Sequence, residues 1–563
     1  MFSAEDTAMA NLRMERYDQI FPHLTDPQIE RISRVGQRRP VAAGEVLFEP
    51  GEQNGSLFLV MEGAVDIDRP VGVGAPSERI VTLGPGQFTG EINMLSARRS
   101  IARAQVVAAG TVIAVDREAL RGLVQRDSEL SEILMRAFIL RRVALIAEGG
   151  SALVLLGSHH SAATLRLREF LTRNAHPFKY TDVESDPDVQ DVLDRFHVAV
   201  NEVPVVICEA GRVLRNPSPE ALAVELGLAG ELDGKRVRDL VVVGAGPAGL
   251  AAAVYGASEG LDVLVLETTA PGGQAGTSSR IENYLGFPTG ISGEALAGRA
   301  LSQAEKFGAE VTIARTAVRL DCDSRPYAIH LADGETVRTR AIVIACGARY
   351  RKLEVPSLPK YEGTGVFYSA THLEAQPCAG REVAVIGGGN SAGQAAVFLS
   401  GVASHVHVLV RGPGLAASMS KYLIDRIAHT PNITLRTMSQ VEALEGESDL
   451  ERVRWRRLPD GDAETRPVRN LFVMTGADPN SEWLDGCVVL DPKRFVKTGA
   501  ELTADDLAAA KWSLTRRPHL LETSIPGVFA VGDIRADSVK RVASAVGEGS
   551  ICIQLVHRAL AEL

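Results

Sequence analysis

The chain has little cysteine, few aromatic residues and no long run of basic charge. Six cysteines among 563 residues are too few for a disulfide-stapled secreted scaffold. A net charge of −10 argues against nucleic acid or an anionic membrane as the main partner. The first residues lack the basic-then-apolar pattern of a signal peptide. The longest uncharged stretch, 240–258, packs three glycines and a proline into six positions, which suits a strand, turn and helix better than a membrane span. We therefore expect a cytoplasmic protein.

Glycine, in contrast, is plentiful, at 53 residues, and much of it lies in clusters typical of tight turns near ligands. The length predicts three to four domains. Residues 10–148 alternate short strands with glycines, which predicts an antiparallel barrel or sandwich with flanking helices. Residues 151–230 predict a small α/β domain in the order strand, helix, strand, helix, strand, strand, helix. From 235 to 563 the pattern is α/β throughout, with two glycine-rich turns about 143 residues apart. We therefore expect two Rossmann-like, three-layer units in this last block.

The segment from Asp239 to Glu267 has the strand–turn–helix–strand pattern of a dinucleotide-binding unit. Gly244, Gly246 and Gly249 follow an apolar run as G-x-G-x-x-G and open an alanine-rich stretch. Glycines at these places permit the tight turn, the approach of a pyrophosphate and the close packing of helix on strand. The helix N-terminus favours the phosphates. Glu267 ends the second strand, where a carboxylate can hydrogen-bond a ribose diol.

A second copy of this pattern begins near Arg381. Its turn is G-x-G-x-x-A, and we predict that it binds a nicotinamide coenzyme through Gly387, Gly389, Asn390, Ser391 and Ala392. The second strand ends at Val410 and Arg411 instead of at a carboxylate. Arg411 can meet a 2′-phosphate, which favours NADPH over NADH.

Further motifs follow one another along residues 235–563. They are APGGQAG (270–276), SRIENYLGFP (279–288), AIVIACGA (341–348), GVFAVGDI (527–534) and VKRVASAVGEG (539–549). In this order they resemble the flavin-binding parts of the low-molecular-weight thioredoxin reductase family. The resemblance implies an FAD domain in two parts, 235–355 and 476–563, around an NAD(P)H domain at 356–475. It implies FAD contacts from Gly273, Gln274, Asn283, Gly532, Asp533, Arg541, Val542 and Ala543.

Some positions depart from the family's pattern. Asp533 matches the aspartate that binds the ribityl chain, although an aspartate there can also cap a helix. Val542 stands where the family usually has glutamine. In the second site the family usually reads H-R-R-x-x-x-R, of which only Arg411 survives beside Gly412 and Ala416. One arginine selects a phosphate less strongly than two or three, so NADPH and NADH both stay open.

The family's active-site dithiol is absent from this chain. Where relatives carry C-A-T-C, the chain reads Ser369-Ala370-Thr371-His372. Because a disulfide reductase needs two thiols, the usual reaction cannot run. Ser369 and His372 are our catalytic candidates, His372 either as a proton donor near the flavin or as a space-filling residue. We interpret Cys378 as buried and inert, with a sulfenate or mixed-disulfide role as the alternative.

Residues 151–230 resemble a thioredoxin or glutaredoxin fold. Val203-Pro204-Val205 is similar to that fold's cis-proline turn, and GRVLRNPS (211–218) to its final hairpin. The first strand-to-helix turn contains Ser158, His159 and His160 but no cysteine, so we expect no redox activity. A docking, ligand-binding or spacer role remains, and we predict no metal site.

Residues 10–148 resemble a cyclic-nucleotide-binding β-roll, and residues 86–106 resemble its phosphate-binding cassette. Gly90 and Glu91 match the family's Gly-Glu pair. Arg99 is one residue short of the arginine position, which alignment from the following strand places at Ser100. Such a shift reverses the side-chain face on a strand, although a compact loop can absorb it. Binding of a small effector and a degenerate β-roll used for dimerisation both stay open.

These features predict a cytoplasmic, homodimeric flavoenzyme that takes hydride from NAD(P)H to FAD. Its electrons would pass to an acceptor other than an internal dithiol, such as ferredoxin or flavodoxin, a quinone or O₂. One alternative is a flavoprotein sensor that responds to a ligand and to redox state. Another is a thioredoxin-disulfide reductase that acts through a single cysteine.

Overall fold

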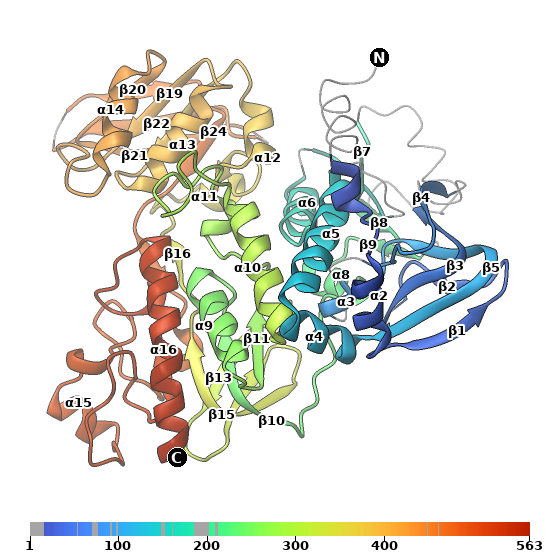
Figure 1. Cartoon of the computed structure of the whole chain (residues 1–563). Helices are drawn as coiled ribbons and strands as arrows, with labels where there is room; N and C mark the ends of the chain where they lie inside the picture. Colours follow the sequence, from blue (N-terminus) through green and yellow to red (C-terminus); the bar gives the residue numbers. More distant parts are fainter. Residues whose placement is uncertain are drawn as a thin grey trace.

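The computed structural model describes residues 16–52, 55–69, 77–90, 93–96, 99–147, 153–159, 161–184, 202–208, 212–447, 449–459 and 461–563. The chain forms an N-terminal β-roll, a small α/β unit and two larger Rossmann-like units (Figure 1). In these ranges no helix combines the length and apolar character needed to cross a membrane.

The β-roll is an antiparallel sheet in the order β1-β5-β3-β4, with β2 paired to β5. Its strands are β1 (Gln37–Val41), β2 (Val46–Phe48), β3 (Ser56–Arg69), β4 (Glu78–Leu83) and β5 (Arg103–Asp116). Its helices are α2 (Asp26–Ser33), α3 (Asn93–Ser96), α4 (Arg117–Arg126) and α5 (Ser128–Ala147). Phe88 and Phe138 meet edge to face between sheet and helices, with centroids 6.2 Å apart. The antiparallel pairing agrees with the prediction, but β3 and β5 are each 14 residues long and not short as predicted.

The small α/β unit has a four-stranded sheet in the order β7-β6-β8-β9. Its elements are β6 (Val154–Gly157), α6 (Ala162–Arg173), β7 (Lys179–Asp182), β8 (Val205–Ile207), β9 (Val213–Arg215) and α8 (Pro219–Glu225). β6 runs parallel to β7 and antiparallel to β8. The peptide bond between Val203 and Pro204 is cis, as the resemblance predicts. The helix predicted around 189–198 lies outside the described residues.

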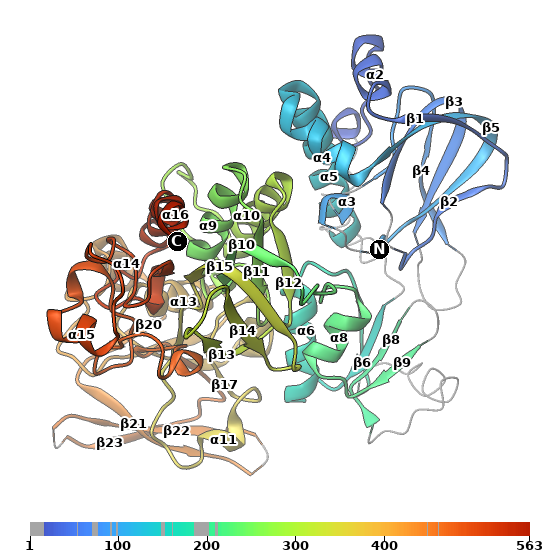
Figure 2. The same cartoon turned by 90° about the horizontal axis from the view of Figure 1, so that it is seen from below.

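The first Rossmann unit has a seven-stranded sheet in the order β12-β11-β10-β15-β14-β13, with β26 paired to β15. Its strands are β10 (Val237–Val243), β11 (Val263–Glu267), β12 (Glu310–Ile313), β13 (Ala317–Asp321), β14 (Tyr327–Leu331), β15 (Thr336–Ile344) and β26 (Val528–Ala530). Its helices are α9 (Pro247–Ser258), α10 (Gly293–Phe307), α15 (Ala504–Ala509) and α16 (Val542–Glu562). Short 3-10 turns are η2 (Ala275–Thr277), η4 (Glu482–Leu484), η5 (Gly499–Glu501) and η6 (Gly532–Ile534). α9 and α16 lie side by side over one sheet face (Figures 1 and 2).

The second Rossmann unit contains a parallel sheet in the order β17-β24-β18-β19-β20 and a three-stranded sheet β21-β22-β23. Its strands are β17 (Val366–Phe367), β18 (Glu382–Ile386), β19 (His405–Leu409), β20 (Ile433–Arg436), β21 (Ser439–Glu445), β22 (Arg452–Arg457), β23 (Ala463–Arg466) and β24 (Asn470–Val473). Its helical segments are α11 (Leu358–Tyr361), α12 (His372–Ala375), η3 (Gln376–Cys378), α13 (Asn390–Ser400) and α14 (Lys421–His429). Two short antiparallel strands, β16 (Ala348–Tyr350) and β25 (Ala477–Pro479), join it to the first unit.

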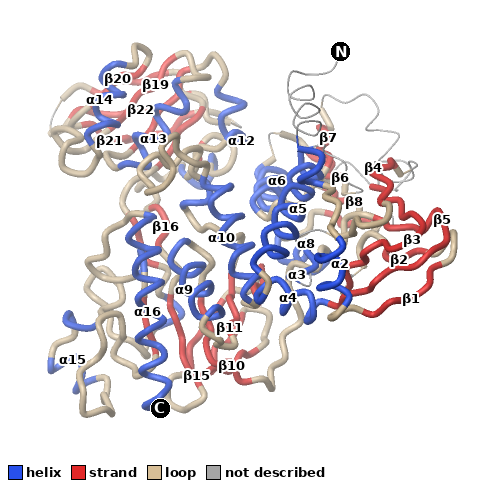
Figure 3. The backbone as a smooth tube through the Cα atoms, in the orientation of Figure 1, coloured by secondary structure: helices blue, strands red, loops and turns tan. Residues whose placement is uncertain are grey.

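Contacts between units include helix packing, polar hydrogen bonds and one buried apolar residue. Helices α4, α5 and α10 group between the β-roll sheet and the first Rossmann sheet (Figure 3). Gln125 on α4 donates from its amide to the carbonyl oxygens of Lys306 and Phe307, at 3.4 and 3.2 Å. Ile313, at the end of β12, is fully buried in the core of the small α/β unit.

Candidate functional site

The first glycine-rich turn requires glycine for two reasons. Gly244 has φ +108°, and a Cβ there would lie 2.4 Å from the carbonyl oxygen of Ala345. A Cβ on Gly249 would lie 1.8 Å from the carbonyl oxygen of Gly244, so helix α9 can approach the strand only without a side chain. Gly246 instead borders open space. The atom nearest to a Cβ added there would be the Cα of Gly273, at 3.9 Å. This cradle lies at the free N–H groups that begin α9, and a pyrophosphate fits its chemistry.

Glu267 is the buried acid beside this cradle. Its carboxylate accepts hydrogen bonds from the backbone N–H groups of Ala245 (2.7 Å), Thr269 (2.9 Å) and Ala270 (3.2 Å). A carboxylate has about four acceptor positions, so one remains for a ribose hydroxyl. Glu267 therefore also holds the turn together, a structural role that the motif did not reveal.

Asp533 lies in η6, the short turn that follows β26. Burial raises the pKa of its carboxyl, and the charge of Lys540 opposes that shift. In the described part of the chain its carboxylate accepts no hydrogen bond, which leaves it available to a polyol. Asp533 does not cap α16, because the residue at that N-cap is Arg541. Helix α16 begins at Val542, with Arg541 and Ala543 exposed at its start.

The remaining residues predicted for the first site are spread along its rim. Gln274 is exposed and donates from its side-chain amide to the carbonyl oxygen of Ala348. Asn283 is exposed as well. Its neighbour Glu282 forms a 2.8 Å ion pair with Arg426 on α14, so this segment meets the second Rossmann unit. Glu548 accepts the backbone N–H of Gly532 at 2.7 Å, a supporting contact that sequence reasoning missed.

The second glycine-rich turn is built on a similar plan. Gly387 has φ +143°, and a Cβ there would lie 2.4 Å from the carbonyl oxygen of Met474. Gly389 has no neighbour within 4 Å of a Cβ position, so the N-terminus of α13 is open. The side chain of Asn390 accepts the backbone N–H of Ser420 at 2.7 Å. Ala392 is fully buried where the first site has Gly249.

Arg411 is exposed at the end of β19. Within the described residues it forms neither a hydrogen bond nor an ion pair, so its charge is available to a phosphate. Lys421, a second basic residue near this turn, is paired with Asp425 one helical turn along α14.

Tyr350 connects the two sites, and sequence reasoning missed it. It ends β16, packs against the core of the second unit and shares a hydrogen bond with Ser391 at the N-terminus of α13. Burial raises the pKa of its phenol, as does the nearby charge of Asp533. The link between the units therefore brings the second turn close to the FAD candidate Asp533.

The segment that lacks the dithiol lies at the boundary between units. Ser369 is half-buried, and His372 is exposed at the start of α12 with its ring against Phe398 at 5.1 Å. Glu294 at the start of α10 lies near His372. Desolvation raises the pKa of Glu294, while His372 lowers it. Cys378 is fully buried, and burial raises the pKa of its thiol to about 12.

Helix α6 of the small unit lies against this same boundary. Arg173 donates to the carbonyl oxygen of Gly273 at 3.0 Å, and Asn174 donates to that of Thr269 at 3.1 Å. At the other end of α6, Ala162 lies next to Gly363. A Cβ atom added to Gly363 would lie 3.2 Å from the Cβ of Ala162. Burial raises the pKa of Glu374 on α12, and the negative charge of Glu169 on α6 raises it further. The small α/β unit is thus docked over residues 363–374.

In the cassette of the β-roll, Gly90 has φ +110°, and its carbonyl oxygen accepts from Arg141 at 2.8 Å. Glu91 lies outside the described residues. Ser100 is buried and donates to the carbonyl oxygen of Ala102 at 2.9 Å, so its hydroxyl serves the turn. Arg99 is exposed, and its side chain reaches Gly227 of the small unit. A Cβ atom added to Gly227 would lie 2.9 Å from the Nε of Arg99.

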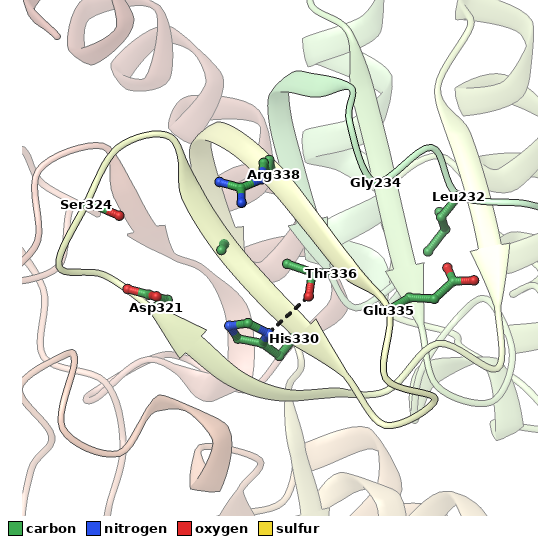
Figure 4. Close-up of a pocket in the computed structure, with 9 residues that line it drawn as sticks. Leu232, Gly234, Asp321, Ser324, His330, Glu335, Thr336 and Arg338 are labelled. Carbon is green, nitrogen blue, oxygen red and sulfur yellow. Dashed lines mark hydrogen bonds between the residues drawn. The ribbon is translucent and has the colours of Figure 1, made fainter.

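One surface hollow of about 560 Å³ lies away from both turns (Figure 4). Asp321, His330 and Arg338 line it, while Leu320, Ile329 and Val337 on the same strands face the core. It opens on the outer face of β13–β15, whereas cofactors bind at the carboxyl ends of parallel strands. In the described ranges no cluster of three or more metal-ligating residues is present.

Comparison with known proteins agrees with this geometry. The sequence model for pyridine nucleotide-disulphide oxidoreductases matches residues 238–549, and that for the cyclic nucleotide-binding domain matches residues 38–127. Thioredoxin reductase of Streptomyces coelicolor is 32% identical over 319 residues, 56% of this chain and 91% of the relative. NADPH-dependent thioredoxin reductase 3 of Arabidopsis thaliana is 32% identical over 334 residues, 58% of this chain and only 59% of the relative. The structure of Lactococcus lactis thioredoxin reductase in its FR conformation superposes with a TM-score of 0.52 at 28% identity, over 58% of this chain and 100% of that one.

Proposed function

Because the chain belongs to the pyridine nucleotide-disulphide oxidoreductase family, we propose that it passes electrons from NAD(P)H through FAD to an acceptor other than an internal dithiol. Membership of the family confirms the prediction of an FAD- and NAD(P)H-dependent oxidoreductase of the thioredoxin reductase-like class. The separate match over residues 38–127 confirms the predicted N-terminal cyclic-nucleotide-binding domain. The acceptors that we propose are ferredoxin or flavodoxin, a quinone or O₂. We also propose that the enzyme is cytoplasmic and homodimeric.

The observation that carries the proposal is the composition of residues 369–378. Ser369 and His372 supply no thiol, and Cys378 is fully buried with a pKa of about 12. A thiolate is the reactive form in disulfide exchange, and at neutral pH this thiol is almost wholly protonated. Helix α6 also lies against residues 363–374, where a bulky disulfide substrate would need access.

The residues of the first site fit FAD. Gly246 and Gly273 border an open cradle at the N-terminus of α9, and Glu267 keeps one acceptor position for a ribose hydroxyl. We assign the ribityl contact to Asp533, whose carboxylate is half-buried. When bound, FAD supplies the capacity to take up a hydride and release its electrons onward.

The residues of the second site fit NAD(P)H. The N-terminus of α13 at Gly389 and Asn390 would hold the pyrophosphate, and Arg411 would bind a 2′-phosphate when one is present. Tyr350 would orient this turn through Ser391. An imidazole nitrogen of His372, which lies near Glu294, would hold a proton at the boundary between the units.

The test is an acceptor screen on the purified full-length chain. We expect a yellow protein with one FAD per chain that consumes NAD(P)H with at least one of the named acceptors. We expect no reduction of thioredoxin or of a generic disulfide reagent. Sustained reduction of thioredoxin would overturn the proposal, and its loss in Cys378→Ser would point to the single-cysteine alternative.

A sensor is the second candidate function, and the position of Arg99 favours it. Arg99 belongs to the cassette of the β-roll but lies against Gly227 of the small unit, so a ligand that draws Arg99 inward would change this contact. A sensor predicts little NAD(P)H consumption with any acceptor. It also predicts a change in flavin fluorescence when a cyclic nucleotide is added.

A further inference from the structure

Two cysteines that sequence analysis did not connect form a disulfide. Cys322 follows β13 and Cys487 lies just after η4, 165 residues later, and their Cα atoms are 6.1 Å apart. The bond ties the first part of the first Rossmann unit to the segment that returns after the second unit. Both residues pack at the edge of the core formed by Leu320, Trp483 and Leu484.

The two cysteines of this disulfide are more exposed to solvent than most of the free cysteines. Cys322 and Cys487 are both half-buried, whereas Cys208, Cys378 and Cys552 are buried thiols. The fourth thiol, Cys346, is partly exposed, but desolvation raises its pKa to about 12. The pair at 322 and 487 is therefore the sulfur centre best placed to meet a dissolved thiol.

The bond also braces the first cofactor site from two directions. Upstream of Cys487, the side-chain amide of Asn480 donates to the carbonyl oxygen of Cys346 at 2.8 Å. The backbone N–H of Asn480 donates to the carbonyl oxygen of Gly347 at 3.1 Å. Downstream, the backbone N–H of Val496 donates to the carbonyl oxygen of Ile534 at 3.0 Å, next to Asp533. Holding residue 487 against β13 therefore restrains both the strand end at 346–347 and the turn that carries Asp533.

We propose that Cys322–Cys487 is a thiol–disulfide exchange site for low-molecular-weight thiols, and that its oxidation state controls how firmly the first site holds its cofactor. A small thiolate attacks one sulfur, forms a mixed disulfide and expels the other cysteine as a thiolate, which takes up a proton. A second small thiolate attacks the mixed disulfide, so two protein thiols and one small-molecule disulfide result. Two small thiols thus supply two electrons and two protons, and the small-molecule disulfide reverses the reaction.

Charge at the site indicates which thiol reacts faster. Asp321 and Asp323 flank Cys322, and in the part of the chain that the structure describes neither carboxylate forms an ion pair. Asp485 near Cys487 is paired with Arg494 and contributes less. The two carboxylates beside Cys322 favour the approach of a cation, and we expect a cationic thiol such as cysteamine to react faster than anionic glutathione at low ionic strength.

The experiment uses the purified, FAD-loaded full-length chain. The protein is exposed to cysteamine or glutathione without denaturant, quenched by alkylation and mapped by mass spectrometry. We expect four free thiols before exchange and six after it, with the two new ones at Cys322 and Cys487. Reduction should weaken FAD binding about threefold or more and lower Tm by about 5 °C or more, because the released chain regains the freedom of a long loop.

Two variants separate this effect from general damage. Cys322→Ser combined with Cys487→Ser should behave as the reduced protein and no longer respond to thiols, whereas Cys378→Ser should respond as the wild type does. Six free thiols before any treatment, resistance of the native bond to both thiols, or exchange that leaves FAD binding and Tm unchanged would each overturn the proposal. These measurements involve no electron acceptor, so their outcome does not depend on the proposed function. If the double variant fails to fold, exchange in the wild type alone tests the proposal.

Discussion

The two glycine-rich turns share a backbone plan but differ at the end of their second strands. In the first, Glu267 is buried and accepts three backbone hydrogen bonds, so the turn is built around its carboxylate. In the second, Arg411 is exposed and makes no such bond in the described part of the chain. The first turn is preorganised without its ligand, which suits a cofactor that stays bound. The second turn is open at Arg411, which suits a coenzyme that exchanges in each catalytic cycle.

The largest expected effect comes from filling the first turn. Gly249→Ala would place a methyl group 1.8 Å from the carbonyl oxygen of Gly244, and we expect a loss of about 3 kcal/mol of stability and of most bound FAD. Thermal unfolding and the flavin-to-protein absorbance ratio measure both. Gly389→Ala is the matched control, because no atom lies within 4 Å of that Cβ position. It should fold with an unchanged Tm, and an equal loss of stability in both variants would contradict the comparison.

Removing the acid of the first site comes next. Glu267→Ala leaves the N–H groups of Ala245, Thr269 and Ala270 without their acceptor, which we expect to cost about 2–3 kcal/mol. FAD binding measured by equilibrium dialysis should weaken by about thirtyfold or more. Glu282→Ala removes a partly exposed ion pair with Arg426 and should change FAD binding less than threefold. Similar losses in the two variants would show that Glu267 has no special role.

At the second turn, Arg411→Ala should reduce kcat/KM for NADPH by about tenfold to a hundredfold and leave NADH kinetics nearly unchanged. The reason is that one charge-assisted hydrogen bond contributes about 1.5–3 kcal/mol. Lys421→Ala is the control, since Lys421 is already paired with Asp425. A wild type that prefers NADH, or an Arg411→Ala variant that keeps a large NADPH preference, would refute this assignment.

The smallest effect is expected at Cys378. Cys378→Ser should change the stopped-flow rate of flavin reduction by NAD(P)H less than twofold, because the thiol lies outside both turns. Since burial raises its pKa to about 12, its thiolate fraction grows only as pH rises toward that value. Alkylation of Cys378 by iodoacetamide should therefore stay slow below about pH 10. A tenfold loss of the reduction rate, or fast alkylation at pH 8, would give this cysteine a role.

Sequence reasoning predicted the parts of the sites that depend on local backbone geometry. Gly244 and Gly387 both have the positive φ that their motifs imply, and Val203–Pro204 is cis. The prediction could not include Tyr350, Glu294 or Glu548, because their roles depend on elements far apart in the chain. It gave Asp533 a second role as a helix cap, which was wrong, since α16 begins nine residues later, at Val542, and its N-cap is Arg541.

Spacing and residue type were sufficient for the strand–turn–helix units, because a tight turn and a close helix–strand contact leave no room for a Cβ atom. They were also sufficient to show that no thiol stands at 369–372. The pairing of Cys322 with Cys487 within the first unit and the docking of α6 on residues 363–374 came instead from the tertiary structure. Such contacts depend on where distant segments meet in space, and loop closure over 165 residues carries no signature in the local sequence.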